Sequence, residues 1–230
     1  MIAPGTPLFD LDDLGKLTEG TFVARPNRFV ALALVKGAQV RAHVADTGRL
    51  EEILTPNRPL LLLKNRPGMK TDYTLIAAKM EEGWVLINTR LHAPVARRAI
   101  ELGVLGYVPK SLKNEVTYSQ SRFDYLADKT YIELKGCSLV QQNRCRFPNA
   151  PTQRGVKHLK ELIDAKTAGF GAVLLVMALR PCDCFEPHPK RDEAFRQTFY
   201  DAMAAGVGFV GFHIRLSDRL VVYDGPLAKC

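Results

Sequence analysis

The sequence predicts an α/β protein, α+β overall, in which a small β-barrel precedes an α/β domain. Between residues 21 and 89, apolar and polar residues alternate in short segments separated by turns, as in half-buried antiparallel strands. After residue 90, strand patterns alternate with helical ones. A continuous apolar run at 172–179 is typical of a central strand covered on both faces. At roughly 100–200 residues per domain, the 230 residues allow one large domain or two small ones.

The first half of the chain contains the predicted barrel. Residues 50–54 interrupt its strands with helix-forming residues and predict a short helix. Short strands at this spacing favour a closed five-stranded OB-like barrel, and we assign residues 1–89 to it as a nucleic-acid-binding domain. The predicted strands are 29–35, 39–44, 60–64, 73–79 and 84–88.

The second half, residues 90–230, is predicted to be the α/β domain. It begins with a helix near residue 95, where an early proline precedes helical apolar spacing. Strands are predicted at 115–118, 122–127, 131–135, 171–179 and 207–214, and helices at 152–168 and 192–205.

Composition narrows the class of protein. The chain has 32 Lys and Arg against 24 Asp and Glu, a formal net charge of +8, which favours a polyanionic partner. Its apolar runs are far shorter than the ~20 residues of a membrane span, so we expect a cytoplasmic protein without a membrane partner. We expect free thiols rather than disulfides at the five cysteines, and the spacing of Cys182 and Cys184 disfavours zinc.

A predicted hairpin carries the residues of chemical interest. Alternation along its second strand places Glu133 and Lys135 on one face, and the partner strand brings Asp124 beside them. Two carboxylates with a backbone carbonyl are enough to hold Mg²⁺ or Mn²⁺ next to a phosphate. A lysine beside such a cation can orient the attacking water and offset charge on the phosphate.

The same residues have a plainer interpretation as a solvated cross-strand ion pair on a surface hairpin. Glu133 and Lys135, however, lie on an apolar strand, and a basic helix and a buried strand follow. Charges in apolar surroundings require a partner, so the context favours a functional site.

With Asp124 as the first acid and Glu133-Leu134-Lys135 as the second element, the sequence resembles the PD-(D/E)xK nuclease superfamily. Over nearly the whole chain it also resembles the sugar fermentation stimulation protein A family. The segments that carry this resemblance are 27–29, 43–50, 70–73, 87–89, 115–124, 133–139, 147–152 and 154–162.

The resemblance implies an OB-like N-terminal domain, a PD-(D/E)xK restriction-endonuclease-like α/β domain, and DNA binding linked to sugar-utilisation genes. By that resemblance Asp124 and Glu133 hold the metal, and Lys135 positions the attacking water. Glu115 is a candidate for a further acid, and Lys157 with Arg154 is expected to grip a phosphate.

The residues also indicate a polyanion independently. The stretch 134–160 contains no carboxylate but six lysines and arginines, and Arg154, Lys157 and His158 share one helix face. In the barrel, cationic residues occur with Phe22 and Phe29, which stack on bases or belong to the core. Thr47 precedes the short predicted helix, whose N-terminus suits a phosphate. The nucleic-acid-binding candidates are Arg28, Arg41, His43, Thr47, Arg49, Arg122, Arg154 and His158, with Arg25 and Lys64 as further cations.

Several alternatives stay open at this point. The partner is predicted to be DNA, with RNA as an alternative, and the sequence allows an oligomer. The same fold could be a catalytically inactive DNA-binding regulator, because fold does not settle activity. A small-molecule enzyme is disfavoured, since neither G-x-G-x-x-G nor G-x-S-x-G occurs.

Overall fold

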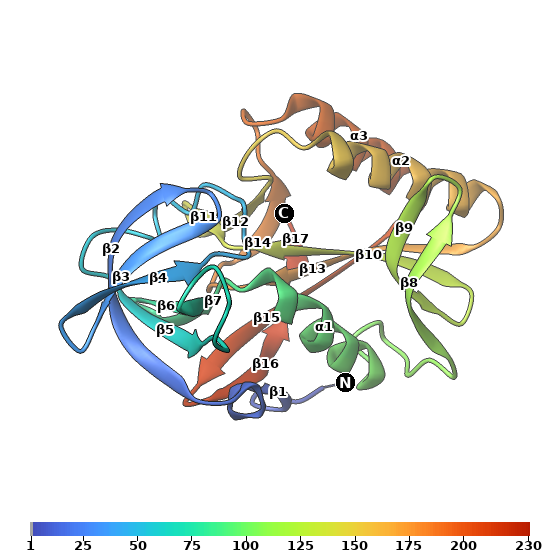
Figure 1. The fold of residues 1–230 in the computed structure, drawn as a ribbon. Helices are drawn as coiled ribbons and strands as arrows, with labels where there is room; N and C mark the ends of the chain where they lie inside the picture. Colours follow the sequence, from blue (N-terminus) through green and yellow to red (C-terminus); the bar gives the residue numbers. More distant parts are fainter. Residues whose placement is uncertain (1) are drawn as a thin grey trace.

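Five strands close into a barrel in the computed structural model, which describes residues 2–230 (Figure 1). They are β2 (Leu17–Asn27), β3 (Val30–Val35), β4 (Ala38–His43), β5 (Pro59–Lys64) and β6 (Tyr73–Met80). β2 pairs antiparallel with β3 and β5, β5 pairs with β6, and parallel pairing of β4 with β6 closes the ring. The predicted closed five-stranded barrel is confirmed.

The membership of the barrel differs from the prediction. β2 is a barrel strand, whereas β7 (Gly83–Leu86) leaves the barrel and places Trp84 opposite Leu216 of β15. Gly20, Pro26 and two register shifts interrupt the alternation of β2, which hid it in the sequence. The helix predicted at 50–54 was wrong, since these residues form turns.

The second half of the chain forms a mixed sheet. β10 (Thr130–Cys137), β13 (Gly171–Ala178) and β15 (Gly208–Ser217) run parallel side by side. β9 (Ser121–Ala127) and β8 (Leu112–Tyr118) extend the sheet antiparallel on one side. β16 (Leu220–Pro226) pairs with β15, and β1 (Pro7–Asp10) pairs with β16, so the N-terminal strand joins this sheet rather than the barrel.

Helices cover both faces of this sheet. α1 (His92–Glu101) lies on one face, and α2 (Gln153–Thr167) and α3 (Glu193–Ala204) lie together on the other (Figure 1). Leu174 and Val176 of β13 pack toward α2 and α3, whereas Leu175 and Met177 join the core shared with α1 and the barrel. The predicted doubly covered strand is confirmed. No helix within residues 2–230 combines the length and the apolar composition needed to cross a membrane.

Short elements connect these layers. Two 3₁₀ helices, η1 (Leu11–Leu14) and η2 (Thr89–Leu91), follow β1 and β7. A separate small sheet contains β11 (Leu139–Gln141), β12 (Arg144–Phe147), β14 (Cys184–Pro187) and β17 (Ala228–Lys229). Sequence analysis missed this sheet because its strands have only two to four residues.

The expectation of free thiols was wrong for four of the five cysteines. Cys145 and Cys182 form one disulfide, and Cys184 and Cys230 form a second, while Cys137 stays a buried thiol. β12 pairs with β14, which in turn pairs with β17, so the small sheet brings these distant cysteines together. The separations of 37 and 46 residues carry no sequence signal of this pairing.

Removing the disulfide between Cys184 and Cys230 is expected to destabilise the protein. The bond closes a loop with a sequence separation of 46 residues, for which the chain-entropy model gives about 4 kcal/mol. The Cys184→Ala/Cys230→Ala variant should lose up to that amount of unfolding free energy in oxidising denaturant titrations. Under reducing conditions the difference from wild type should vanish, and a persistent difference would instead implicate side-chain packing.

Candidate functional site

The structure brings Asp124, Glu133 and Lys135 together at the end of a hairpin. Backbone pairing between β9 and β10 runs as far as Ile132 opposite Tyr125. Beyond that pair, the Leu134 N–H donates to Asp124 Oδ2 at 2.7 Å, so the carboxylate itself continues the contact between the strands. The side chains of Glu133 and Lys135 follow on the same face of β10, toward α2.

Glu133 is the centre of a buried polar cluster. Its Oε1 accepts hydrogen bonds from Lys135 Nζ and from His158 Nδ1 on α2. Because an ionised carboxylate only accepts, His158 Nδ1 carries the proton, and its Nε2 lies 3.4 Å from Arg154 Nε. Burial alone raises the pKa of Glu133, but Lys135 and His158 outweigh it and hold the pKa below its usual value.

The second oxygen of Glu133 lacks a partner. Oε2 is fully buried and receives no hydrogen bond from any group within residues 2–230. A buried acceptor without a partner is unfavourable, and native proteins rarely keep one without a functional reason.

The ionised form of Asp124 is unfavourable in the folded protein. Burial, followed by the neighbouring charge of Glu133, raises the pKa of Asp124 to about 6, although the Leu134 N–H and Lys135 act in the opposite direction. Each of two neighbouring carboxylates disfavours the ionised form of the other, and a cation placed between them stabilises both negative charges.

These side chains line a groove of about 610 Å³ between the barrel and the second domain, here called the interdomain groove. Barrel residues Arg28, Thr47 and Gly48 form one wall, and Asp124 and Glu133 belong to the other. The groove therefore joins predicted nucleic-acid-binding residues of the barrel to the carboxylate pair.

Arg25 builds the barrel wall of the groove. Sequence analysis grouped it with the cations of a polyanion site, but its guanidinium donates to the backbone carbonyls of Arg28, Asp46, Gly48 and Arg49 at 2.6–2.9 Å. Five donors in a planar fork allow one arginine to hold a whole loop in this way. Arg25 thus shapes the loop that presents Thr47.

His92 is a groove residue that sequence analysis missed. It begins α1 and lines the groove, and burial lowers the pKa of His92 to about 4, so the ring is neutral. A Cβ added to Gly136 would lie 2.5 Å from His92 Nδ1, so a glycine is required there. A single histidine at the start of a proline-containing helix gave no sequence signal of its contact with Gly136.

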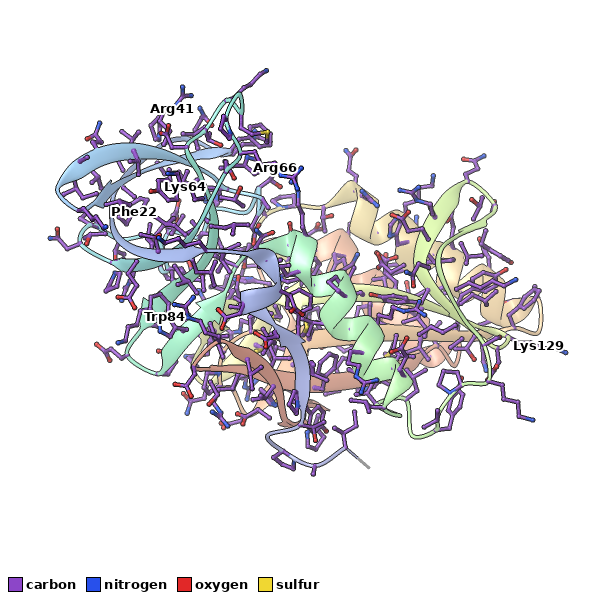
Figure 2. All side chains as sticks on the ribbon, turned by 60° about the horizontal axis from the view of Figure 1, so that its bottom comes forward. Phe22, Arg41, Lys64, Arg66, Trp84 and Lys129 are labelled. Carbon is purple, nitrogen blue, oxygen red and sulfur yellow. A yellow bond between two sulfur atoms is a disulfide. The ribbon has the colours of Figure 1, made fainter. Side chains whose placement is uncertain are left out.

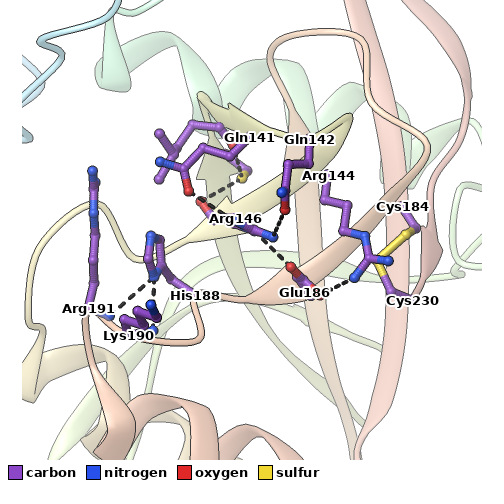
Figure 3. A network of polar contacts seen from close by, with 12 residues as sticks. Gln141, Gln142, Arg144, Arg146, Cys184, Glu186, His188, Lys190, Arg191 and Cys230 are labelled. Carbon is purple, nitrogen blue, oxygen red and sulfur yellow. Dashed lines mark hydrogen bonds and ion pairs between the residues drawn. A yellow bond between two sulfur atoms is a disulfide. The ribbon is translucent and has the colours of Figure 1, made fainter.

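The small sheet supplies a further cation. Arg146 lines the groove and is held by Glu186 Oε1 at 2.7 Å and by Gln141 and Gln142 (Figure 3). Arg144 bonds the other oxygen of Glu186 at 2.8 Å, close to the disulfide between Cys184 and Cys230. This fixed network keeps Arg146 oriented at the end of the groove.

Three of the predicted nucleic-acid-binding residues of the barrel do not line the groove. Arg41, His43 and Arg49 lie on the barrel outside the groove lining, and Figure 2 labels Arg41, Lys64 and Arg66 on the barrel. Phe22 is buried in the core, which makes it unavailable for stacking, whereas Phe29 is half-exposed.

A second pocket lies beside the groove, against α2. Arg122, Lys157 and His158 line it, and Arg154 lines both the pocket and the groove. Glu115 lies outside the groove lining, with its side chain 66% exposed and 3.3 Å from Arg122.

The donor set of the groove is compatible with a hard cation. Within the described part of the chain no three His, Cys, Asp or Glu side chains gather into a metal cluster. Mg²⁺ is bound through one or two carboxylates and keeps several water molecules. Asp124 and the free Oε2 of Glu133 match that requirement, so the residues present fit such an ion.

Comparisons with known proteins agree with this architecture. A family model described as the SfsA N-terminal OB domain matches residues 23–87, and one described as the Sugar fermentation stimulation protein RE domain matches residues 90–219. A sugar fermentation stimulation protein homolog of Saccharolobus solfataricus is 35% identical over 94% of this chain and 86% of its own length. A homolog from Thermosipho melanesiensis is 37% identical over 89% of this chain and 90% of its own length.

A solved structure is also similar. It is described as Pyrococcus furiosus SfsA in complex with Ca²⁺, is 28% identical, and covers 98% of this chain and all of that chain with a TM-score of 0.88. The similarity therefore extends over both halves of the fold.

Proposed function

This chain belongs to the sugar fermentation stimulation protein family, and on that premise we propose that it is a DNA-binding nuclease that hydrolyses phosphodiester bonds with Mg²⁺ or Mn²⁺. The observation that carries the proposal is the buried, unpartnered Oε2 of Glu133 beside Asp124. A relative described in complex with Ca²⁺ supports a divalent cation in this fold.

Each residue of the groove has a role in the proposal. Asp124 and Glu133 would hold the cation, and a divalent cation there would supply an acidified water and polarisation of the phosphodiester. Lys135 keeps Glu133 ionised and orients the nucleophile from its ammonium group. His158 holds the same oxygen, Oε1, as Lys135 does, which leaves Oε2 without a hydrogen bond.

DNA reaches the carboxylates along the interdomain groove in this proposal. Arg28 and Arg146 contact its backbone on opposite sides, and the barrel cations Arg41 and Lys64 extend the positive surface. Such binding should weaken steeply with salt, because each neutralised phosphate releases counterions. We place this activity in the cytoplasm.

The test is cleavage of single-stranded, duplex and branched DNA, and of RNA, in Mg²⁺ or Mn²⁺. Glu133→Gln removes the charge that holds the cation and should lower the cleavage rate about 10³-fold, which corresponds to several kcal/mol of lost stabilisation. Glu81→Gln, the same change at an exposed turn position, should cleave like wild type. Binding to DNA in chelator should persist in both variants.

Two results would contradict the proposal. Cleavage that is indifferent to Glu133→Gln would place the reaction elsewhere or in a contaminant. Metal-independent binding without cleavage of any substrate would instead favour a DNA-binding regulator with this fold.

A further inference from the structure

The pocket beside the groove has its own architecture. It has a volume of about 360 Å³ and lies between the start of β9, with the turn residue Gln120 before it, and the first two turns of α2. Its lining shares only Arg154 with the interdomain groove. We call it the basic pocket.

The basic pocket is built for an anion. Arg122, Arg154 and Lys157 line it, and its lining residues include no carboxylate. Lys157 Nζ donates to Gln120 O at 3.0 Å, which holds the ammonium over the pocket. Arg122 and Glu115 are both exposed, so their ion pair is weak, and Lys157 Nζ lies 3.9 Å from Glu161, too far for a close hydrogen bond; both cations therefore stay able to bind a phosphate.

His158 connects the basic pocket with the carboxylate of Glu133. His158 lines the pocket, and its Nδ1 bonds Glu133 Oε1. One imidazole ring therefore separates the anion pocket from the proposed cation site, and Arg154 is shared by both cavities. A strand with its phosphate in the pocket would therefore lie next to the proposed cation site.

The charge of the pocket favours the end of a strand over its interior. A phosphodiester within a strand carries one negative charge, whereas a terminal phosphate carries about −1.5 to −2 near pH 7. Three cationic side chains and the positive N-terminal end of the 15-residue helix α2 match the larger charge.

We propose that the basic pocket binds the terminal phosphate of a nucleic-acid strand, which makes the protein selective for phosphorylated ends. This inference rests on the proposed nuclease function, and it adds the class of substrate. In the same reading, Lys157 and Arg122 set substrate specificity, whereas Asp124 and Glu133 carry the reaction.

The test uses oligonucleotides of one sequence with a 5′-phosphate, a 3′-phosphate or no terminal phosphate. Binding is measured in chelator, so that cleavage does not interfere. One phosphorylated form should bind about tenfold more tightly than the unphosphorylated one, as expected for charged hydrogen bonds. Lys157→Gln and Arg122→Gln should remove this preference. Lys129→Gln, at an exposed turn at the far end of the sheet, should keep it (Figure 2).

The outcomes separate this inference from the nuclease proposal. Cleavage without any preference among the three oligonucleotides would overturn the pocket's role and leave the nuclease standing. A preference that depends on Lys157, without cleavage, would support the pocket and contradict the nuclease. If inorganic phosphate alone binds as tightly as the phosphorylated strand, or if Lys157→Gln leaves the preference intact, the strand-end inference is wrong.

Discussion

Asp124→Asn is expected to give a protein that no longer cleaves DNA and yet is more stable than wild type near pH 7.5. Burial and the adjacent Glu133 raise the pKa of Asp124 to about 6 from 3.8, so its ionisation in the fold is unfavourable. Asparagine can still accept the Leu134 N–H but carries no charge. The shift corresponds to about 2–3 kcal/mol, to be measured by denaturant unfolding without divalent cations.

The pH dependence follows from the direction of the shift. Between about pH 4 and 6 the folded protein binds more protons at Asp124 than the unfolded chain does, so this contribution to stability is present at low pH and is lost as pH rises through 6. The gap between wild type and Asp124→Asn should widen over that window and close again when saturating Mg²⁺ binds wild type alone. Asp183→Asn, at an exposed position, serves as the control. A variant less stable than wild type at pH 7.5 would contradict the electrostatic account.

Lys135→Met is expected to slow cleavage strongly and, in contrast to Asp124→Asn, to lower the stability of the fold. Glu133 is almost fully buried, and the loss of its ammonium partner leaves its charge with His158 alone. Breaking a buried ion pair from one side costs about 3–5 kcal/mol. The cleavage rate should fall about 10²–10⁴-fold, as for other positioned catalytic groups. Unfolding titrations and cleavage assays on the same preparation measure both effects.

A second variant separates catalysis from folding at Lys135. Glu133→Gln combined with Lys135→Met removes the uncompensated charge at position 133, and it should regain most of the lost stability while staying inactive. If Lys135→Met loses stability but keeps the wild-type cleavage rate, the lysine has a structural role only. Binding of DNA should fall less than the cleavage rate, because one cation among many is lost.

Much of the fold could be predicted from local sequence patterns. The apolar run of β13 alternates between two cores, as its composition indicated. Helices α2 and α3 match their predicted ranges within one or two residues, since amphipathic spacing is a local property. Most strands that were missed are short or irregular: β2 has bulges, and β12 and β14 have four residues each, but the seven-residue strand β16 was missed as well.

The carboxylate pair and the lysine were also predictable, because they depend on a hairpin. The alternation of β10 and the register of β9 place Asp124, Glu133 and Lys135 together over only 12 residues of chain. His158 and Arg154 were recognised as one helix face, but their contact with Glu133 depends on how α2 packs on the sheet.

The sequence by itself determined that a barrel precedes an α/β domain, where the central strand and helices α2 and α3 lie, and which three residues meet at the hairpin, because each follows from a local period. Only the tertiary structure decided which barrel residues line the groove together with the carboxylates. It also decided that Arg25 holds backbone carbonyls rather than a phosphate, and that four cysteines form disulfides. These features join segments tens of residues apart. They arise from burial and long-range pairing, which are properties of the whole packed chain and leave no periodic trace in the sequence.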